Sequence, residues 1–217
     1  MNRQELKKAF DEELIDKETY MKNLFELEQA PKKSKGPKRI YDPITEEEFA
    51  KLLKATKKLH HRVAFILGYA SGLRAEEIIR LSPDDINLKS KKIHVREGKG
   101  SKDRNTFIAG WLRESHLSVL PLKIDIRALQ RAFLRHSMKC GINRIIATYN
   151  RNGKEVPIYR LKLHSLRRGF AALLMKRKVP VNVVQAFMGH ENLSTTNRYT
   201  KVNAEDAIEQ ALQAWDN

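Results

Sequence analysis

Two helix-breaking residues, Pro180 and Gly189, divide residues 164–199 into three short segments, and this division limits the fold more than any other feature of the sequence. Apolar residues recur at helical spacing from Phe170 to Leu174, which predicts a first helix that Pro180 ends. The apolar positions between Val183 and Met188 predict a second short helix, and a glycine after it is typical of a helix C-terminus. The stretch is therefore predicted to fold as consecutive short helices.

Side chains with complementary chemistry lie along these helices. His164 and Arg167 are three residues apart and share one helix face, and His190 follows Gly189. The hydroxyl-rich turn of residues 193–196 is predicted to cap a third helix, one turn into which lies Tyr199. A tyrosine hydroxyl can act as a nucleophile, an arginine clamps phosphate oxygens, and a histidine moves protons. A single His-x-x-Arg pair is usually a surface pair and a single tyrosine is usually core packing, so the prediction rests on their joint spacing.

This spacing resembles that of the tyrosine site-specific recombinases, also called the phage integrase family. The family pattern is His-x-x-Arg, then Gly-His, then a tyrosine nine residues later, which matches residues 164–167, 189–190 and 199. Residues 72–77 match its upstream Gly-Leu-Arg-x-x-Glu box, and residues 98–102 match its Gly-Lys-Gly-x-Lys hairpin tip. The resemblance covers about residues 40 to 217. It departs at Lys201, where many relatives have a histidine outside the catalytic set.

The resemblance implies an enzyme that cuts and rejoins DNA strands. Tyr199 is expected to attack the scissile phosphate and leave a 3′-phosphotyrosine, while Arg74 and Arg167 hold the non-bridging oxygens. The two histidines would move protons and orient the phosphate, Lys99 would protonate the leaving oxygen, and Glu77 would orient its neighbours. No metal or ATP cofactor is expected, because the phosphotyrosine keeps the bond energy. The expected catalytic set is Arg74, Lys99, His164, Arg167, His190 and Tyr199.

Composition favours the same kind of partner. The chain has 217 residues and a formal charge of +16, which indicates a polyanion such as double-stranded DNA. The single Cys140 excludes an intrachain disulfide and fits a reducing, cytoplasmic setting. The sequence lacks an apolar run long enough to predict a membrane helix and a signal-peptide core, so no membrane partner is expected. A prokaryotic, viral or plasmid-borne origin fits the resemblance.

Two domains are predicted. Residues 1–39 are expected to form two short helices, over 3–12 and 17–28 with Asp16 as a cap, followed by a basic linker at 31–39. This linker is either a disordered spacer or a DNA contact, and a flexible basic segment can be both. Residues 40–217 are expected to be the catalytic domain. The predicted DNA-binding residues are Lys32, Lys33, Lys35, Lys38, Arg39, Lys102, Arg104 and Arg168.

The predicted fold class of the second domain is α+β, mainly helical with a small antiparallel sheet. A capping box at Thr45 opens its first helix. Further helices are predicted at 62–71, 75–81, 125–139 and 204–215, strands at 86–88, 92–96 and 104–108, and a hairpin at 145–149 and 155–161 around Asn152-Gly153.

Two helices leave alternatives open. The basic residues at every fourth position of helix 125–139, from Arg127 to Lys139, form either a DNA-facing or a solvated stripe. The apolar stripe of helix 204–215 can pack on its own domain, whereas the resemblance implies docking on a neighbouring subunit in a tetramer.

Two functions compete with recombination. A type IB topoisomerase-like enzyme would reseal the same strand, and a DNA-binding relative would have lost catalysis. All six candidate catalytic side chains are present, which argues against the inactive DNA-binding relative. One further departure is that about 40 residues precede the predicted catalytic domain, where family members usually carry a larger helical DNA-binding domain. The chain is therefore interpreted as an isolated catalytic part or a short member.

Overall fold

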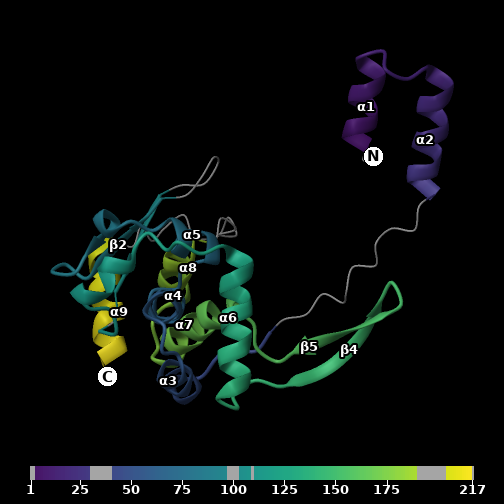
Figure 1. Ribbon diagram of the computed structural model, residues 1–217. Coiled ribbons are helices and arrows are strands. Elements are labelled where there is room, and N and C mark those ends of the chain that lie inside the picture. Colours follow the sequence, from purple (N-terminus) through teal and green to yellow (C-terminus); the bar gives the residue numbers. More distant parts are fainter. Residues whose placement is uncertain (1–2, 30–40, 97–102, 109, 190–203, 217) are drawn as a thin grey trace. The chain divides into compact units, whose positions relative to one another are not determined.

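The computed structural model describes residues 3–29, 41–96, 103–108, 110–189 and 204–216 (Figure 1). The chain divides into two compact units, one made of residues 1–38 and 148–156, the other of residues 39–147 and 157–217.

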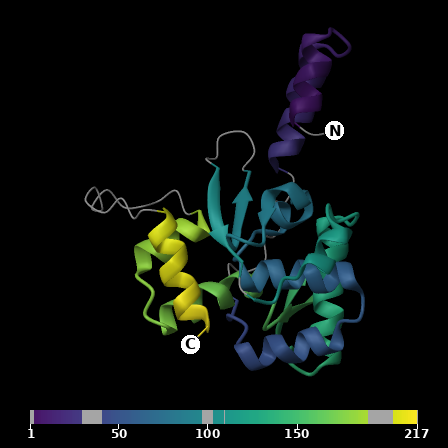
Figure 2. The same ribbon diagram turned by 90° about the vertical axis from the view of Figure 1, so that its left-hand side faces the viewer.

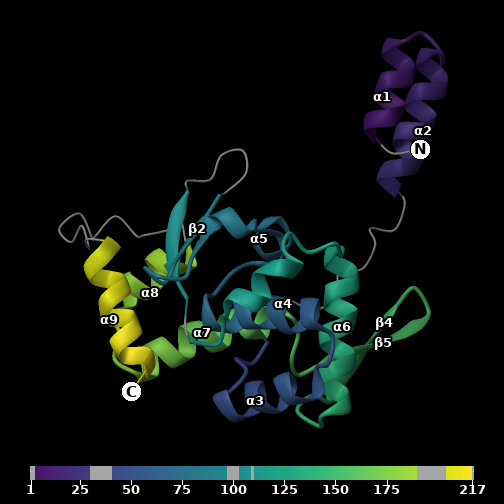
Figure 3. The same cartoon turned by 60° about the vertical axis from the view of Figure 1, so that its left-hand side comes forward.

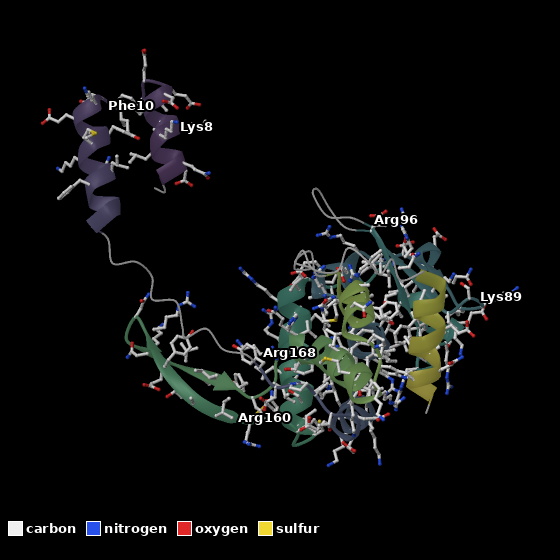
Figure 4. All side chains as sticks on the ribbon, turned by 180° about the vertical axis from the view of Figure 1, so that it is seen from behind. Lys8, Phe10, Lys89, Arg96, Arg160 and Arg168 are labelled. Atoms are coloured by element: carbon white, nitrogen blue, oxygen red, sulfur yellow. The ribbon has the colours of Figure 1, made fainter. Side chains whose placement is uncertain are left out.

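The first unit contains α1 (Arg3–Asp11) and α2 (Lys17–Gln29). Asp16 caps α2, since its carboxylate accepts a hydrogen bond of 2.7 Å from the backbone nitrogen of Thr19. The rings of Phe10 and Tyr20 stack with centroids 4.6 Å apart, and Phe10 lies between the two helices (Figure 4). The two helices therefore form an antiparallel pair through a small apolar contact.

The second unit is built around α4 (Leu59–Ala70), whose residues from Val63 onward are buried. Beside it lie α3 (Glu46–Ala55) and α7 (His164–Lys176) (Figure 3). The predicted capping box starts α3: Thr45 Oγ1 accepts from the Glu48 backbone at 3.2 Å, and Glu48 accepts from the Thr45 backbone at 3.0 Å. Gly169 lets α7 pack closely against the segment that precedes α3. A Cβ at this position would lie 2.6 Å from the carbonyl oxygen of Ile44.

A three-stranded antiparallel sheet follows α5 (Ala75–Arg80) and a 3₁₀ turn at Pro83–Asp85. Its order is β1 (Ile86–Asn87), β2 (Lys92–Val95) and β3 (Arg104–Phe107). Val95 pairs with Arg104 and Ile93 with Thr106, so these four side chains share one face. Three of them are buried, which places the fourth, Arg104, on the inward face as well.

The helix α9 (Ala204–Asp216) packs on its own domain beside β3 and α7 (Figure 2). The buried ring of Trp215 lies 5.8 Å from Tyr69 and 5.9 Å from Phe107, measured between ring centroids. Arg177 donates a 2.7 Å hydrogen bond to the carbonyl oxygen of Ala214. In the single chain, Ile208, Ala211 and Trp215 of this helix are therefore buried in its own domain.

The helix α6 (Ile126–Lys139) leads to a hairpin of β4 (Ile145–Arg151) and β5 (Lys154–Tyr159). The predicted turn is present, because Asn152 and Gly153 both have positive φ. At the base of the hairpin, the buried Asn143 side chain donates to and accepts from the Leu161 backbone, at 3.0 and 2.9 Å. Arg160 also fixes this base, since it donates to the Ile142 carbonyl at 2.6 Å (Figure 4).

The predicted fold class is confirmed, with three local differences. Pro180 does not end the first helix of the 164–189 stretch: α7 stops at Lys176, Lys178 has a φ of 63°, and Pro180 starts α8 (Val181–Met188). A 3₁₀ helix at Glu114–Val119 was not predicted. α4 begins three residues earlier than predicted, because polar side chains hide the apolar period of its first turn. Within the described residues, no helix is both long enough and apolar enough to span a bilayer.

Candidate active site

The loop between α4 and α5 places Arg74 next to α7. Gly72 turns the chain with a φ of 66°, and a Cβ there would lie 2.5 Å from the ring of Phe170. The turn presents the carbonyl oxygen of Gly72 to the buried Arg167, whose Nη1 donates to it at 2.5 Å. Arg74 then precedes the first residue of α5, as predicted. The Gly-Leu-Arg sequence is thus the local reason that two distant arginines meet.

The carboxylate of Glu77 lies among three arginines in the part of the chain that the structure describes. Arg74 donates to it from the backbone nitrogen at 2.7 Å and from Nη1 at 2.9 Å. Arg104 binds both carboxylate oxygens, at 2.9 and 2.8 Å, and Nη1 of Arg167 lies 3.8 Å from Oε2. One negative and three positive side chains leave this cluster a formal charge of +2.

The last three carbonyl groups of the α8 segment bind the same three arginines. Arg104 Nε donates to Phe187 at 2.9 Å, Arg167 Nη2 donates to Met188, and Arg74 Nη2 donates to Gly189 at 2.7 Å. A helix C-terminus carries partial negative charge, so it attracts guanidinium groups. Gly189 ends the helix with a φ of 57°, as the sequence predicted, and the next residue is His190.

The arginines hold the pKa of the Glu77 carboxyl low. Burial by itself raises this pKa, but the hydrogen bonds from Arg104 and from the Arg74 backbone outweigh it. The charges of Arg104 and Arg167 act in the same direction, and the pKa falls from 4.5 to about 2. Glu77 is therefore ionised at neutral pH, which suits a residue that orients arginines and not one that transfers protons.

A cavity of about 270 Å³ opens beside this cluster. Arg74, His164 and Arg167 line it, and they come from the α4–α5 loop and from the first turn of α7. Arg167 is 2% exposed, whereas His164 is open to solvent. The cavity thus combines fixed guanidinium donors with an accessible imidazole, a set that can bind a phosphate group and exchange a proton with it.

A second cavity, of about 580 Å³, shares His164, Gln130 and Leu163 with the first. Arg127 and Arg131 of α6 line it. Its remaining polar lining includes Tyr41, Tyr159 and Lys162, whose Nζ lies 4.6 Å from the ring centroid of Tyr41. One half of the basic stripe of α6 therefore borders the candidate site, together with aromatic rings.

The structure brings together Arg74, His164, Arg167 and Glu77 among the predicted site residues. Arg104, predicted to bind DNA, lies on the inward face of β3 and is bonded to Glu77, with its side chain 9% exposed. Arg168 is half-buried on α7 (Figure 4). The remaining predicted residues lie outside the described part of the chain: Lys32, Lys33, Lys35, Lys38, Arg39, Lys99, Lys102, His190 and Tyr199.

Sequence reasoning missed the inward position of Arg104. Thr106 and Ile108 share a strand face with Arg104 and are buried, but Phe107 on the opposite face is buried as well. Alternation within this strand therefore does not tell which face points inward. Gln130 was also missed, and an exposed glutamine on a helix gives no signal either. Among the residues that the structure describes, His, Cys, Asp and Glu side chains form no group of three or more suited to a metal ion.

Comparison with solved structures identifies the fold. The integrase from mycobacterium phage Brujita superposes with a TM-score of 0.61 at 17% identity, over 90% of this chain and 70% of that one. The catalytic core of lambda integrase gives a TM-score of 0.51 at 18% identity, over 69% of this chain and 91% of that core. The second unit thus has the fold of integrase catalytic cores.

Sequence comparison specifies the family. The model of the phage integrase family matches residues 43–206, and the chain belongs to this family. Tyrosine recombinase XerA of Pyrococcus horikoshii is 31% identical over 185 residues, and XerA of Thermococcus onnurineus is 34% identical over 176 residues. These alignments cover 83% and 79% of this chain, and 65% and 62% of the two relatives. The chain thus spans somewhat less than two thirds of their length.

Proposed function

We propose that the protein is a site-specific DNA recombinase that cleaves and rejoins strands through a 3′-phosphotyrosine at Tyr199. The observation that carries this proposal is the cavity in which Arg74, Arg167 and His164 meet beside a cluster of excess positive charge. A phosphodiester needs this arrangement most in the transition state, when charge builds up on its non-bridging oxygens.

The arginines are suited to this role because the protein already fixes them. Each uses some of its five N–H donors on Glu77 or on a carbonyl oxygen, which orients the guanidinium before substrate arrives. Arg74 is 35% exposed and Arg167 is buried, so Arg74 reaches farther toward the substrate and Arg167 lines the floor. His164 and His190 would exchange protons with the phosphate, and Lys99 would protonate the leaving 5′-oxygen. No metal or nucleotide takes part in these steps.

The test is covalent capture. The protein is mixed with duplexes of randomised sequence that carry a nick, and complexes that resist denaturant are isolated and sequenced. We expect an adduct on a defined sequence, joined through Tyr199, that Tyr199→Phe abolishes while the dissociation constant stays within about twofold, since the lost hydroxyl contributes little to an electrostatic interface. Adducts of the Tyr199→Phe variant, or their absence from the wild-type protein, would overturn the proposal.

The same experiment separates the two competing functions. A catalytically inactive DNA-binding relative would bind the duplexes and form no adduct. A topoisomerase-like enzyme would form adducts with little sequence preference and would reseal the same strand. A recombinase selects a site and joins strands from two duplexes, which labelled partner strands detect.

The DNA face would extend over the second cavity. Arg127 and Arg131 supply exposed cations there, and the neighbouring tyrosine rings offer stacking surfaces. The linker residues at 31–39 and Arg168 would add phosphate contacts. Because Arg127 and Arg131 line this cavity, we interpret the first half of the basic stripe of α6 as facing DNA.

Assembly on DNA is part of the proposal. One structural neighbour is a lambda integrase tetramer bound to a Holliday junction, with a TM-score of 0.50. We propose that this chain also forms a tetramer, in which α9 can leave its own core and dock on a neighbouring copy. The contacts of Trp215 with Tyr69 and Phe107 would then form between subunits. An intracellular location follows from a DNA substrate.

A further inference from the structure

The side chain of Arg104 connects three segments that lie far apart in the sequence. Arg104 is the first residue of β3 and follows Lys99 by five residues in the sequence. Its guanidinium binds both carboxylate oxygens of Glu77 on α5, at 2.9 and 2.8 Å, and its Nε donates to the carbonyl oxygen of Phe187 on α8 at 2.9 Å. A planar group with donors on two edges can make these bonds at once.

The end of α8 also packs directly on this guanidinium. A Cβ at Gly189 would lie 3.0 Å from Cδ of Arg104 and 3.1 Å from its Cζ and Nε. The backbone of Gly189 therefore lies against the arginine side chain, and a larger residue at this position would require Arg104 to shift by a few tenths of an ångström. Because His190 is bonded to Gly189, the place where the chain leaves α8 depends on the position of Arg104.

In the sequence, the three connected segments adjoin half of the six proposed catalytic residues. The hairpin carries Lys99, α5 is preceded by Arg74, and α8 is followed by His190. We propose that Arg104 is a positioning residue for strand cleavage, which holds the hairpin base, Glu77 and the end of α8 in one arrangement and makes no contact with DNA. This inference rests on the proposed function, because it concerns the rate of that reaction.

Lysine is the informative replacement at this position. It keeps the positive charge beside Glu77, but its single nitrogen cannot bind both carboxylate oxygens and the Phe187 carbonyl in the geometry of the fork. The matched control is Arg96→Lys, which makes the same chemical change at the residue that follows β2. Arg96 is 69% exposed and pairs with Asp85 at 2.8 Å, away from Glu77.

The experiment measures single-turnover cleavage of the nicked duplex that covalent capture with wild-type protein selects. Cleavage is followed at saturating protein, and the dissociation constant is measured at several salt concentrations. For Arg104→Lys we expect the saturating rate to fall by a factor on the order of 10–10², the usual cost of a small misplacement of catalytic groups. The dissociation constant and its salt slope should stay within about twofold of wild type, and Arg96→Lys should match wild type in both.

The other outcomes overturn the inference. A weaker dissociation constant or a smaller salt slope means that Arg104 contacts DNA. An unchanged saturating rate means that it positions nothing in the reaction, and loss of the cooperative thermal transition means that its role is to hold the core. If wild type and Arg96→Lys also form no adduct, the proposed function has failed. Normal adduct formation by all three proteins refutes the inference alone.

Discussion

Replacing Glu77 by glutamine removes a negative charge that three arginines share, and the structure sets the size of the effect. The pKa of Glu77 is 4.5 without the fold and about 2 within it. A difference of about 2.5 pKa units corresponds to about 3 kcal/mol of folding free energy. Because the folded pKa is the lower one, this stabilisation is fully present above pH 4.5 and is lost as the pH falls through about 2. Glu77→Gln should therefore cost about 3 kcal/mol at neutral pH.

The assay is urea denaturation followed by circular dichroism, at pH 7 and pH 3. Glutamine does not titrate, so the difference in the free energy of unfolding between wild type and variant should shrink to about 1 kcal/mol at pH 3. Glu76→Gln is the control: Glu76 is the exposed neighbour on the same helix, and its difference from wild type should stay within about 0.5 kcal/mol at both pH values. A difference for Glu77→Gln that is the same at both pH values would refute the reasoning, since the cost would then not come from the carboxylate charge.

Three further predictions concern the hairpin, the linker and the helix contact. Lys99→Ala should slow cleavage by a factor on the order of 10²–10⁴ and recover on a substrate with a bridging 5′-sulfur, which leaves without a proton; if Lys102→Ala recovers instead, the acid is Lys102. Neutral replacements in the linker should flatten the dependence of DNA affinity on salt without moving the cleavage position, and an unchanged slope would mean that the linker does not touch DNA. Gly169→Ala should lower the free energy of unfolding by about 1–3 kcal/mol because its Cβ meets the Ile44 carbonyl at 2.6 Å, whereas Gly110→Ala, with open space around it, should change it little; equal effects would contradict the packing argument. The residues replaced in the linker are Lys32, Lys33, Lys35, Lys38 and Arg39.

Local patterns predicted most of the secondary structure, because caps, turns and apolar periods act over a few residues. The box at Thr45, the Asn152-Gly153 turn and the helix stop at Gly189 are all present. The first turn of α4 was missed, since His61 is 4% exposed and a buried polar residue interrupts the apolar pattern. Pro180 was assigned to the end of one helix, whereas it begins the next, where its missing N–H has no cost.

The spacing of His164 and Arg167 predicted that they share a helix face, whereas the family resemblance was needed to place Arg74 beside them, because no local pattern fixes a contact over some ninety residues. Their internal partners could not be predicted from the sequence. The pairing of Glu77 with Arg104 depends on how the sheet lies against α5, and the carbonyl acceptors of α8 belong to the backbone, which leaves no mark in the sequence. Tertiary packing decides both.

The carbonyl trio at the end of α8 also limits how the sequence can change over time. Each residue added to a helix rotates its end by about 100° and advances it by about 1.5 Å. An insertion or deletion between residues 181 and 188 would therefore turn the carbonyls of Phe187, Met188 and Gly189 away from all three arginines together. Exposed positions of this helix, such as Val181 and Ala186, are free to vary in kind. The length of α8 is not free to vary, so the helix sets a fixed number of residues between Pro180 and the three carbonyl groups, in addition to burying Val183, Val184 and Phe187 in the core.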